Sequence, residues 1–165
     1  MSKTAENLMA AFAGESQANR KYLAYAKQAE KEGHPQAAKL FRAAADAETI
    51  HAHAHLRNAG KIGSTLENIK DAIAGETHEF KNMYPEMIKD AEAEGEKVAH
   101  VYFGYANQAE EVHANLYQKM MDTIDNPAET DYYNCSVCGY THEGPFEGGK
   151  CPICNASPSA FYKVD

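Results

Sequence analysis

Four stretches of this chain each carry a glutamate in the middle of an otherwise apolar helical stripe. Residues 4–125 are rich in alanine, glutamate and lysine and contain proline only at positions 35 and 85, so helix is expected almost throughout. Apolar side chains recur there at helical spacing, and each stripe includes one central carboxylate. These are Glu15, Glu48, Glu76 and Glu110. Because a carboxylate buried without a partner costs several kcal/mol, the four need a shared counter-charge.

Glycine breaks divide this region into four helices of about 4–32, 35–59, 65–93 and 96–125. Ser64-x-x-Glu67 is typical of a capping box and is expected to start the third helix. Pro85 is expected to bend the third helix without ending it, because the apolar period continues beyond it.

The four helices form a duplicated hairpin. Residues 13–16 (Ala-Gly-Glu-Ser) recur at 74–77 (Ala-Gly-Glu-Thr), and the Glu-x-x-His motif of 48–51 recurs at 110–113. In a helix, Glu-x-x-His places both side chains on one face. Two metal ions bound between the helices would supply the counter-charge, as in dimetal carboxylate sites of ferritin-like bundles. Mixed oxygen and imidazole ligands favour iron, with manganese as the alternative.

The two halves of the repeat differ at one carboxylate. Glu79 follows Glu76 by one helical turn, whereas the matching position of the first helix is Ala18. We therefore expect one metal to have an extra carboxylate ligand, which makes the two metal positions inequivalent. The alternative is that Glu79 is an exposed acid.

The C-terminal segment has a different composition and contains every cysteine of the chain. They form two Cys-x-x-Cys pairs, Cys135 with Cys138 and Cys151 with Cys154. Four thiolates in two short knuckles predict a tetrahedral metal site, and spacing alone leaves structural zinc and redox-active iron open. Gly139 and Asn155 follow the knuckles, where a left-handed backbone is expected. We predict a helical domain over 1–126 and a metal-knuckle domain over 127–165.

Charge and hydropathy exclude two classes of partner. The chain has 16 Lys and Arg against 24 Asp and Glu and a net charge of −8, which disfavours nucleic acid. No stretch approaches the roughly 20 apolar residues that span a bilayer, so no membrane association is expected. The N-terminus has no signal-peptide pattern, and in a reducing compartment paired cysteines are expected to bind metal in preference to forming disulfides. We expect a cytoplasmic protein.

Taken together, these motifs resemble the rubrerythrin family over essentially the whole chain. The matching segments are Gly14-Glu15-Ser16-Gln17-Ala18, Glu48-x-x-His51, Gly75-Glu76-x-x-Glu79, Tyr84-Pro85-Glu86, Glu110-x-x-His113, Cys135-x-x-Cys138-Gly139-Tyr140 and Cys151-Pro152-x-Cys154. The resemblance implies an all-α ferritin-like four-helix bundle with a small C-terminal rubredoxin-like domain. It also implies two iron ions in the bundle and one iron, not zinc, on the cysteines. Asn155 departs from the glycine usual at that position.

The resemblance assigns roles to individual residues. Glu48 and Glu110 would bridge the two irons, Glu15 and Glu76 would be terminal ligands, and His113 would bind the second iron. The first iron would exchange His51 for Glu79 as it is oxidised. Tyr22 and Tyr84 would donate hydrogen bonds near the irons; ordinary core tyrosines are the alternative.

The implied activity is reduction of hydrogen peroxide to water in defence against oxidative stress. Electrons would pass through the Fe(SCys)₄ centre from rubredoxin or from an NAD(P)H-dependent reductase. The sequence has no nucleotide-binding glycine fingerprint, so NAD(P)H would act through that partner. The alternatives are a ferroxidase or iron-handling protein, an O₂-reducing di-iron protein, and an electron carrier or zinc-stabilised binding module.

The connector between the second and third helices predicts a swapped homodimer. Ferritin-like bundles run these two helices parallel, so the chain must travel back along a helix about 37 Å long. Residues 60–65 span only roughly 20 Å when extended. We therefore expect the first two helices of one chain to pack on the last two of another. The alternative is an up-down-up-down bundle within one chain.

Overall fold

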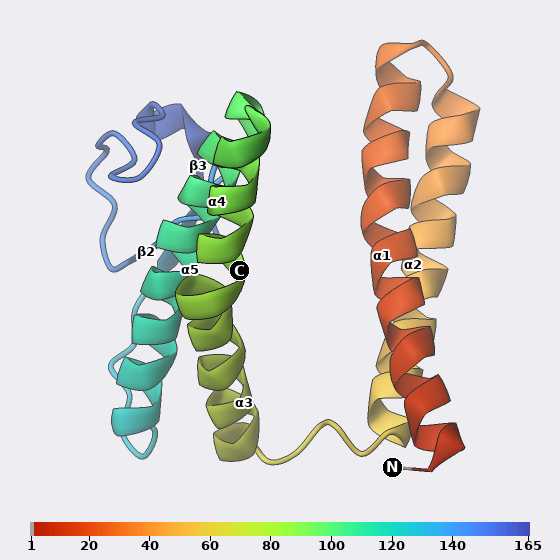
Figure 1. Ribbon diagram of the computed structural model, residues 1–165, viewed down its shortest axis with the longest axis horizontal. Helices are drawn as coiled ribbons and strands as arrows, with labels where there is room; N and C mark the ends of the chain where they lie inside the picture. The colour runs from red at the N-terminus through yellow and green to blue at the C-terminus, as the bar shows by residue number, and fades with distance from the viewer. Residues whose placement is uncertain (1) are drawn as a thin grey trace. The chain divides into compact units, whose positions relative to one another are not determined.

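The computed structural model describes residues 2–165, which divide into two compact units (Figure 1). The first unit ends at Gly63 and is a hairpin of two helices, α1 (Lys3–Lys31) and α2 (Pro35–Asn58). The second is Ser64–Asp165 and holds the remaining helices and a small sheet. Among the described residues, no helix is both long enough and apolar enough to cross a membrane.

Small side chains form the contact between α1 and α2. Ala26, Ala29 and Ala38 are buried together, and Phe41 packs against them. The Asn19 amide donates to the Ala45 carbonyl across the hairpin at 2.8 Å. Within the described helices the buried side chains are alanines and Ile69, so the larger apolar residues of the stripes stay partly exposed.

The third predicted helix contains a π turn. α3 (Thr65–His78), η1 (Glu79–Met83) and α4 (Tyr84–Glu94) follow one another without a break. The prediction that Pro85 does not end the helix is confirmed, but a single α-helix over 65–93 was wrong. Within η1 the Tyr84 N–H donates to the Glu79 carbonyl five residues back. Pro85 has no N–H, and its ring would clash with the carbonyl four residues earlier in a regular α-helix. The wider turn just before Pro85 accommodates the ring.

The repeat itself contains the signal for this π turn. Glu15 matches Glu76 at a separation of 61 positions, whereas Glu30 near the end of the first helix matches Glu92 at 62. The third helix therefore holds one residue more than the first, and a single inserted residue in a helix is accommodated as a π turn.

The ends of the other helices follow local chemistry. The Ser64 hydroxyl accepts from the Glu67 backbone N–H at 3.3 Å while the Glu67 carboxylate accepts from the Ser64 N–H at 2.7 Å, which confirms the capping box. The last helix, α5 (Lys97–Asp122), stops three residues short of its predicted end because Thr123 leaves helical geometry, with φ at −118°.

The C-terminal segment is a three-stranded antiparallel sheet with the order β2-β1-β3. The strands are β1 (Tyr132–Cys135), β2 (Thr141–Glu143) and β3 (Phe161–Lys163), and the short helix η2 (Pro158–Ala160) precedes β3. Phe146 stacks on Phe161 with the ring centroids 4.5 Å apart. Gly139 (φ 81°) and Asn155 (φ 60°) are left-handed, as predicted for the residues after the knuckles.

Candidate metal centres

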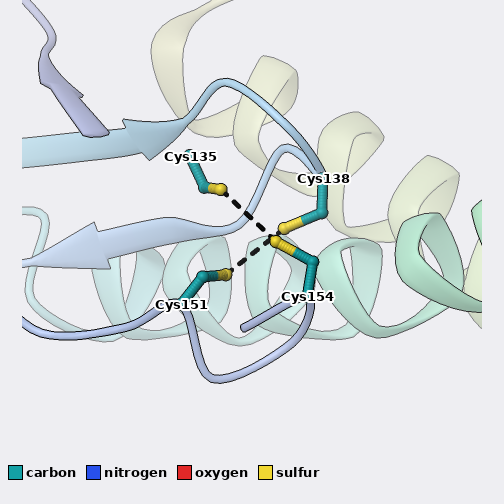
Figure 2. A group of neighbouring side chains, drawn as sticks. All are labelled: Cys135, Cys138, Cys151 and Cys154. Carbon is teal, nitrogen blue, oxygen red and sulfur yellow. Dashed lines mark hydrogen bonds between the residues drawn. The ribbon is translucent and has the colours of Figure 1, made fainter. Parts of the chain in front are cut away.

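The four cysteines converge on one point between two loops (Figure 2). Cys135 and Cys138 lie where β1 turns toward β2, and Cys151 and Cys154 lie in the loop before η2. All four are free thiols. The Cys135 and Cys154 sulfurs are 3.7 Å apart, and those of Cys138 and Cys151 are 3.4 Å apart. A tetrahedral ion with metal–sulfur bonds of about 2.3 Å requires sulfurs about 3.8 Å apart, so the thiols fit such an ion.

Backbone amides make this pocket suitable for thiolates. Burial raises the pKa of the Cys138 thiol. At Cys135 burial acts in the same direction, but hydrogen bonds from the Val137 and Cys138 backbone N–H groups outweigh it and lower the pKa. Donors aimed at sulfur stabilise the anionic form that binds metal.

The first bundle group lies within the α1–α2 hairpin. It consists of Glu15 from α1 with Glu48 and His51 from α2, whose ligand atoms all lie within 4.8 Å of one another. The His51 Nδ1 is 3.0 Å from the Glu48 carboxylate. The side chain of His51 is 56 % exposed, and that of Glu48 is 18 % exposed. This hairpin therefore presents two carboxylates and one open imidazole.

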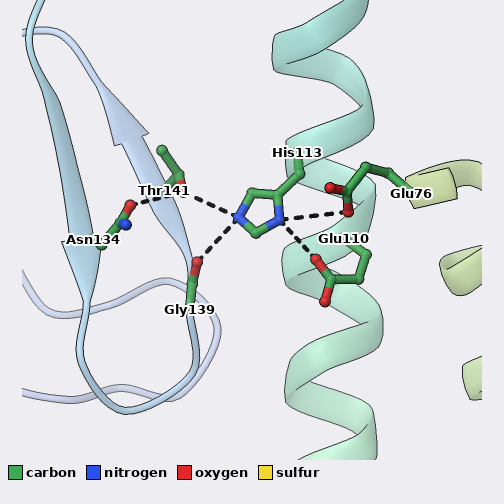
Figure 3. Close-up of polar contacts among 6 residues, drawn as sticks. All are labelled: Glu76, Glu110, His113, Asn134, Gly139 and Thr141. Carbon is green, nitrogen blue, oxygen red and sulfur yellow. Dashed lines mark hydrogen bonds and ion pairs between the residues drawn. The ribbon is translucent and has the colours of Figure 1, made fainter. Parts of the chain in front are cut away.

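The second group lies in the other unit and matches the first through the repeat. Glu76 from α3 meets Glu110 and His113 from α5, again with ligand atoms within 4.8 Å of one another (Figure 3). The His113 Nδ1 is 2.6 Å from the Glu110 carboxylate and 3.7 Å from that of Glu76. The side chain of His113 is 25 % exposed, less than half the value for His51.

In the second group, two carboxylates share a single imidazole as their positively charged partner. Burial, together with the neighbouring Glu110, raises the pKa of Glu76 to about 7. The hydrogen bond with His113 lowers the pKa of Glu110, and the same bond raises the pKa of His113. Two adjacent carboxylates thus compete for one imidazole. A bound cation would allow both to ionise.

The remaining predicted site residues are Glu79, Tyr84 and Tyr22, which lie outside the two groups of ligand atoms. Glu79 is the first residue of η1 and lies outside the cluster of ligand atoms, yet burial and then the charge of Glu110 raise its pKa. Tyr84 packs on Phe103, and its pKa is raised by burial and by Glu110. Tyr22 packs against Tyr25 and Phe41, which also contact each other, in the first unit.

The contacts between the sheet and α5 were not predicted, because no sequence pattern indicates them. The His113 Nε2 lies 3.0 Å from the Thr141 hydroxyl and 3.1 Å from the Gly139 carbonyl (Figure 3). Further along α5, Lys119 pairs with Glu143 of β2. The loop that holds Cys138 is therefore bound directly to the helix that carries Glu110 and His113.

Both bundle groups fit a divalent or trivalent ion by their chemistry. Ligands around an octahedral ion with bonds of about 2.1 Å lie roughly 3 to 4.2 Å apart. The ligand atoms of each group, all within 4.8 Å of one another, are close to this spacing. Two carboxylates and one imidazole form a mixed oxygen and nitrogen set of the kind that suits iron or manganese.

Comparison with known proteins agrees with both halves of this arrangement. Residues 6–121 match the family described as rubrerythrin, and residues 133–162 match the rubredoxin-like domain of rubrerythrin. Nigerythrin from Nitratidesulfovibrio vulgaris is 38 % identical over 173 residues, covering 96 % of this chain and 85 % of that protein. Rubrerythrin-2 from Clostridium acetobutylicum is 36 % identical over 176 residues, covering 96 % and 95 %.

Solved structures give the same result. Nigerythrin in a partially reduced state and in a fully reduced, all-ferrous state each superpose with a TM-score of 0.60 at 35 % identity. Each alignment covers 99 % of this chain and 88 % of that structure.

Proposed function

The chain belongs to the rubrerythrin family of oxidoreductases, with a di-iron site and a rubredoxin-like Fe(SCys)₄ site, and on that premise we propose that it reduces hydrogen peroxide to water. One observation carries the proposal: the knuckle residue Gly139 is hydrogen-bonded to His113. An electron-accepting tail attached to a di-iron ligand is useful to an enzyme that must be re-reduced after each turnover. An iron-storage protein has no comparable use for it.

The bundle ions would be held by the two matched groups together with Glu79. By resemblance to the family, Glu48 and Glu110 would be shared by both ions, and Glu15 and Glu76 would each hold one of them. When bound, two ferrous ions supply the two electrons that convert H₂O₂ and two protons into two waters. In this proposal His51 and Glu79 would alternate as ligands of the first ion, and the exposure of the His51 side chain supports this role. His113 has hydrogen-bond partners on both sides of its ring and would remain a ligand throughout.

Tyr84 is suited to donate a hydrogen bond to the substrate. It lies close enough to Glu110, Glu79 and Glu76 for their charges, in addition to burial, to raise its pKa. The phenol therefore keeps its proton at neutral pH and can donate to a peroxide oxygen. We assign Tyr22 the equivalent role from the first hairpin.

We propose that the complete site forms in a swapped homodimer. α2 has 24 residues and is about 36 Å long, whereas the connector 59–64 spans roughly 20 Å when extended. Partly exposed large apolar residues on each hairpin also require further cover. One chain would then contribute Glu15, Glu48 and His51, and the other Glu76, Glu79, Glu110 and His113.

The proposed function also implies a division into two domains and a reducing compartment. We propose a di-iron domain over 1–126 and an electron-transfer domain over 127–165. Four free thiols grouped for metal binding favour the reducing cytoplasm. The electron donor would be a rubredoxin or an NAD(P)H-dependent reductase.

Stopped-flow spectroscopy tests the proposed activity. Fully reduced, iron-loaded protein is mixed with H₂O₂ or with O₂, and the visible absorption of the Fe(SCys)₄ centre is followed as it is oxidised. We expect peroxide to react much faster than O₂. Cys138→Ser protein serves as the control, because its bundle should still react while the visible signal is lost. Faster oxidation by O₂ would contradict the proposal and favour the O₂-reducing or ferroxidase alternative.

A further inference from the structure

His113 is held by hydrogen bonds on both sides of its ring, which distinguishes it from its repeat partner. Its Nδ1 faces Glu110 at 2.6 Å, and its Nε2 faces the Thr141 hydroxyl at 3.0 Å and the Gly139 carbonyl at 3.1 Å. Among residues 2–165, the only hydrogen-bond partner of the His51 ring is Glu48. The sheet therefore anchors one imidazole of the repeat and leaves the other free.

The direction of each hydrogen bond around Nε2 follows from the donors and acceptors present. The Gly139 carbonyl can only accept. The Thr141 hydroxyl donates its single proton to the Asn134 side-chain oxygen at 2.9 Å, so toward His113 it presents a lone pair (Figure 3). Both neighbours of Nε2 are acceptors, and Nε2 must carry the proton.

We propose that Thr141, oriented by Asn134, is a positioning residue that keeps the His113 proton on Nε2 and so leaves Nδ1 free to bind a metal ion. A neutral imidazole carries one N–H, so fixing it on one nitrogen makes the other a ligand. Hydrogen bonds of this kind behind a metal-binding histidine set its tautomer and ring orientation. The inference rests on the proposed function, because it takes His113 as a ligand of the bundle ions.

The same contacts link the two metal centres of the second unit. Thr141 is the first residue of β2, and Asn134 precedes Cys135 on the paired strand β1, where the two residues face each other in register. The ring of His113 is therefore oriented by the strands that also shape the first cysteine knuckle.

Zinc binding to the full chain tests this role without relying on activity. Thr141→Val keeps the shape and removes the acceptor, Thr141→Ser keeps the hydroxyl, and Asn134→Ala leaves the hydroxyl free to rotate. Thr123→Val is the matched control, because the Thr123 hydroxyl donates to the Lys119 carbonyl of its own helix end and, within residues 2–165, makes no hydrogen bond with the sheet or with His113. Zn²⁺ affinity of the bundle is measured by chelator competition, and the ring N–H of His113 is followed by NMR of the zinc-loaded, ¹⁵N-histidine-labelled protein.

We expect Thr141→Val to weaken zinc binding about tenfold, at the lower end of the range for such supporting contacts because the Gly139 carbonyl remains. The Nε2 proton should also exchange faster with water. Thr141→Ser and Thr123→Val should stay within about twofold of wild type, and Asn134→Ala should fall between. If Thr141→Val does not fold, Asn134→Ala decides the matter. An Nε2 proton exchange rate and a zinc affinity equal to those of wild type in that variant would overturn the inference.

Two further results separate the inference from the proposed function. Unchanged affinity and proton exchange in folded Thr141→Val would overturn the inference alone, as would an equal loss in Thr141→Ser. Wild-type protein that takes up zinc only at its cysteines would overturn the proposed di-iron function, and the inference with it.

Discussion

The metal-free protein should lose free energy of unfolding as pH rises from 5 to 8. The folded pKa of Glu76 is about 7, raised from 4.5. Between these values the unfolded chain loses this proton while the folded chain keeps it, so folding becomes less favourable as pH rises. The raised pKa of His113 acts in the same direction, because its stabilising charge is lost as pH rises through the folded pKa. The lowered pKa of Glu110 matters only below pH 4.5.

The size of the effect follows from the Glu76 shift. A change of the Glu76 pKa from 4.5 to about 7 corresponds to about 3–4 kcal/mol at most, and partial solvent exposure reduces this to about 1–2 kcal/mol. Urea unfolding followed by circular dichroism, at one protein concentration and at pH 5, 6, 7 and 8, measures it after chelator treatment. Glu76→Gln cannot ionise and should remove much of the decline, leaving the variant about 1 kcal/mol more stable than wild type at pH 8.

The metal-loaded protein should instead become more stable as pH rises. Its ligands must lose their protons to bind metal, so metal affinity rises with pH. If metal-free wild type becomes more stable toward pH 8, or if Glu76→Gln declines in parallel with wild type, the electrostatic description of this group is refuted.

Three further outcomes can be measured. Ser64→Ala should cost about 1 kcal/mol in urea unfolding, because it removes the capping box of α3, whereas Ser159→Ala at an exposed position of η2 should cost little. Gly139→Ala should destabilise the knuckle by about 1–2 kcal/mol. The cost comes from the left-handed backbone alone, because nothing lies within 4 Å of the added Cβ. It should be seen as faster removal of the knuckle iron by a chelator, followed by the loss of visible absorption. Analytical ultracentrifugation of metal-loaded protein should show a dimer; a monomer with both bundle ions bound would refute the swapped arrangement.

Much of this site could be predicted from the sequence because its donor groups are local. Glu48 with His51, and Glu110 with His113, share a helix face through the geometry of a single turn. The cysteine knuckles are likewise short loops, and the left-handed residues after them were predicted from position alone. The alternation of helices and breaks was also correct in outline. The individual ligand assignments remain predictions for metal-binding experiments.

The π turn was predictable in principle and was missed. The spacing between matched glutamates changes from 61 to 62 across the third helix, which indicates one inserted residue. Periodicity alone could not reveal it, because a single added residue rotates the apolar stripe by less than one-third of a turn.

The sequence by itself determined which residues can serve as ligands and on which helix face they lie, since helix and knuckle geometry depend on near neighbours. Only the tertiary structure decided how these groups are tuned. The pKa of Glu76 depends on burial against Glu110, and the orientation of His113 depends on Thr141, 28 positions away in the chain. Such contacts arise from the packing of separate elements, and no local pattern encodes that packing.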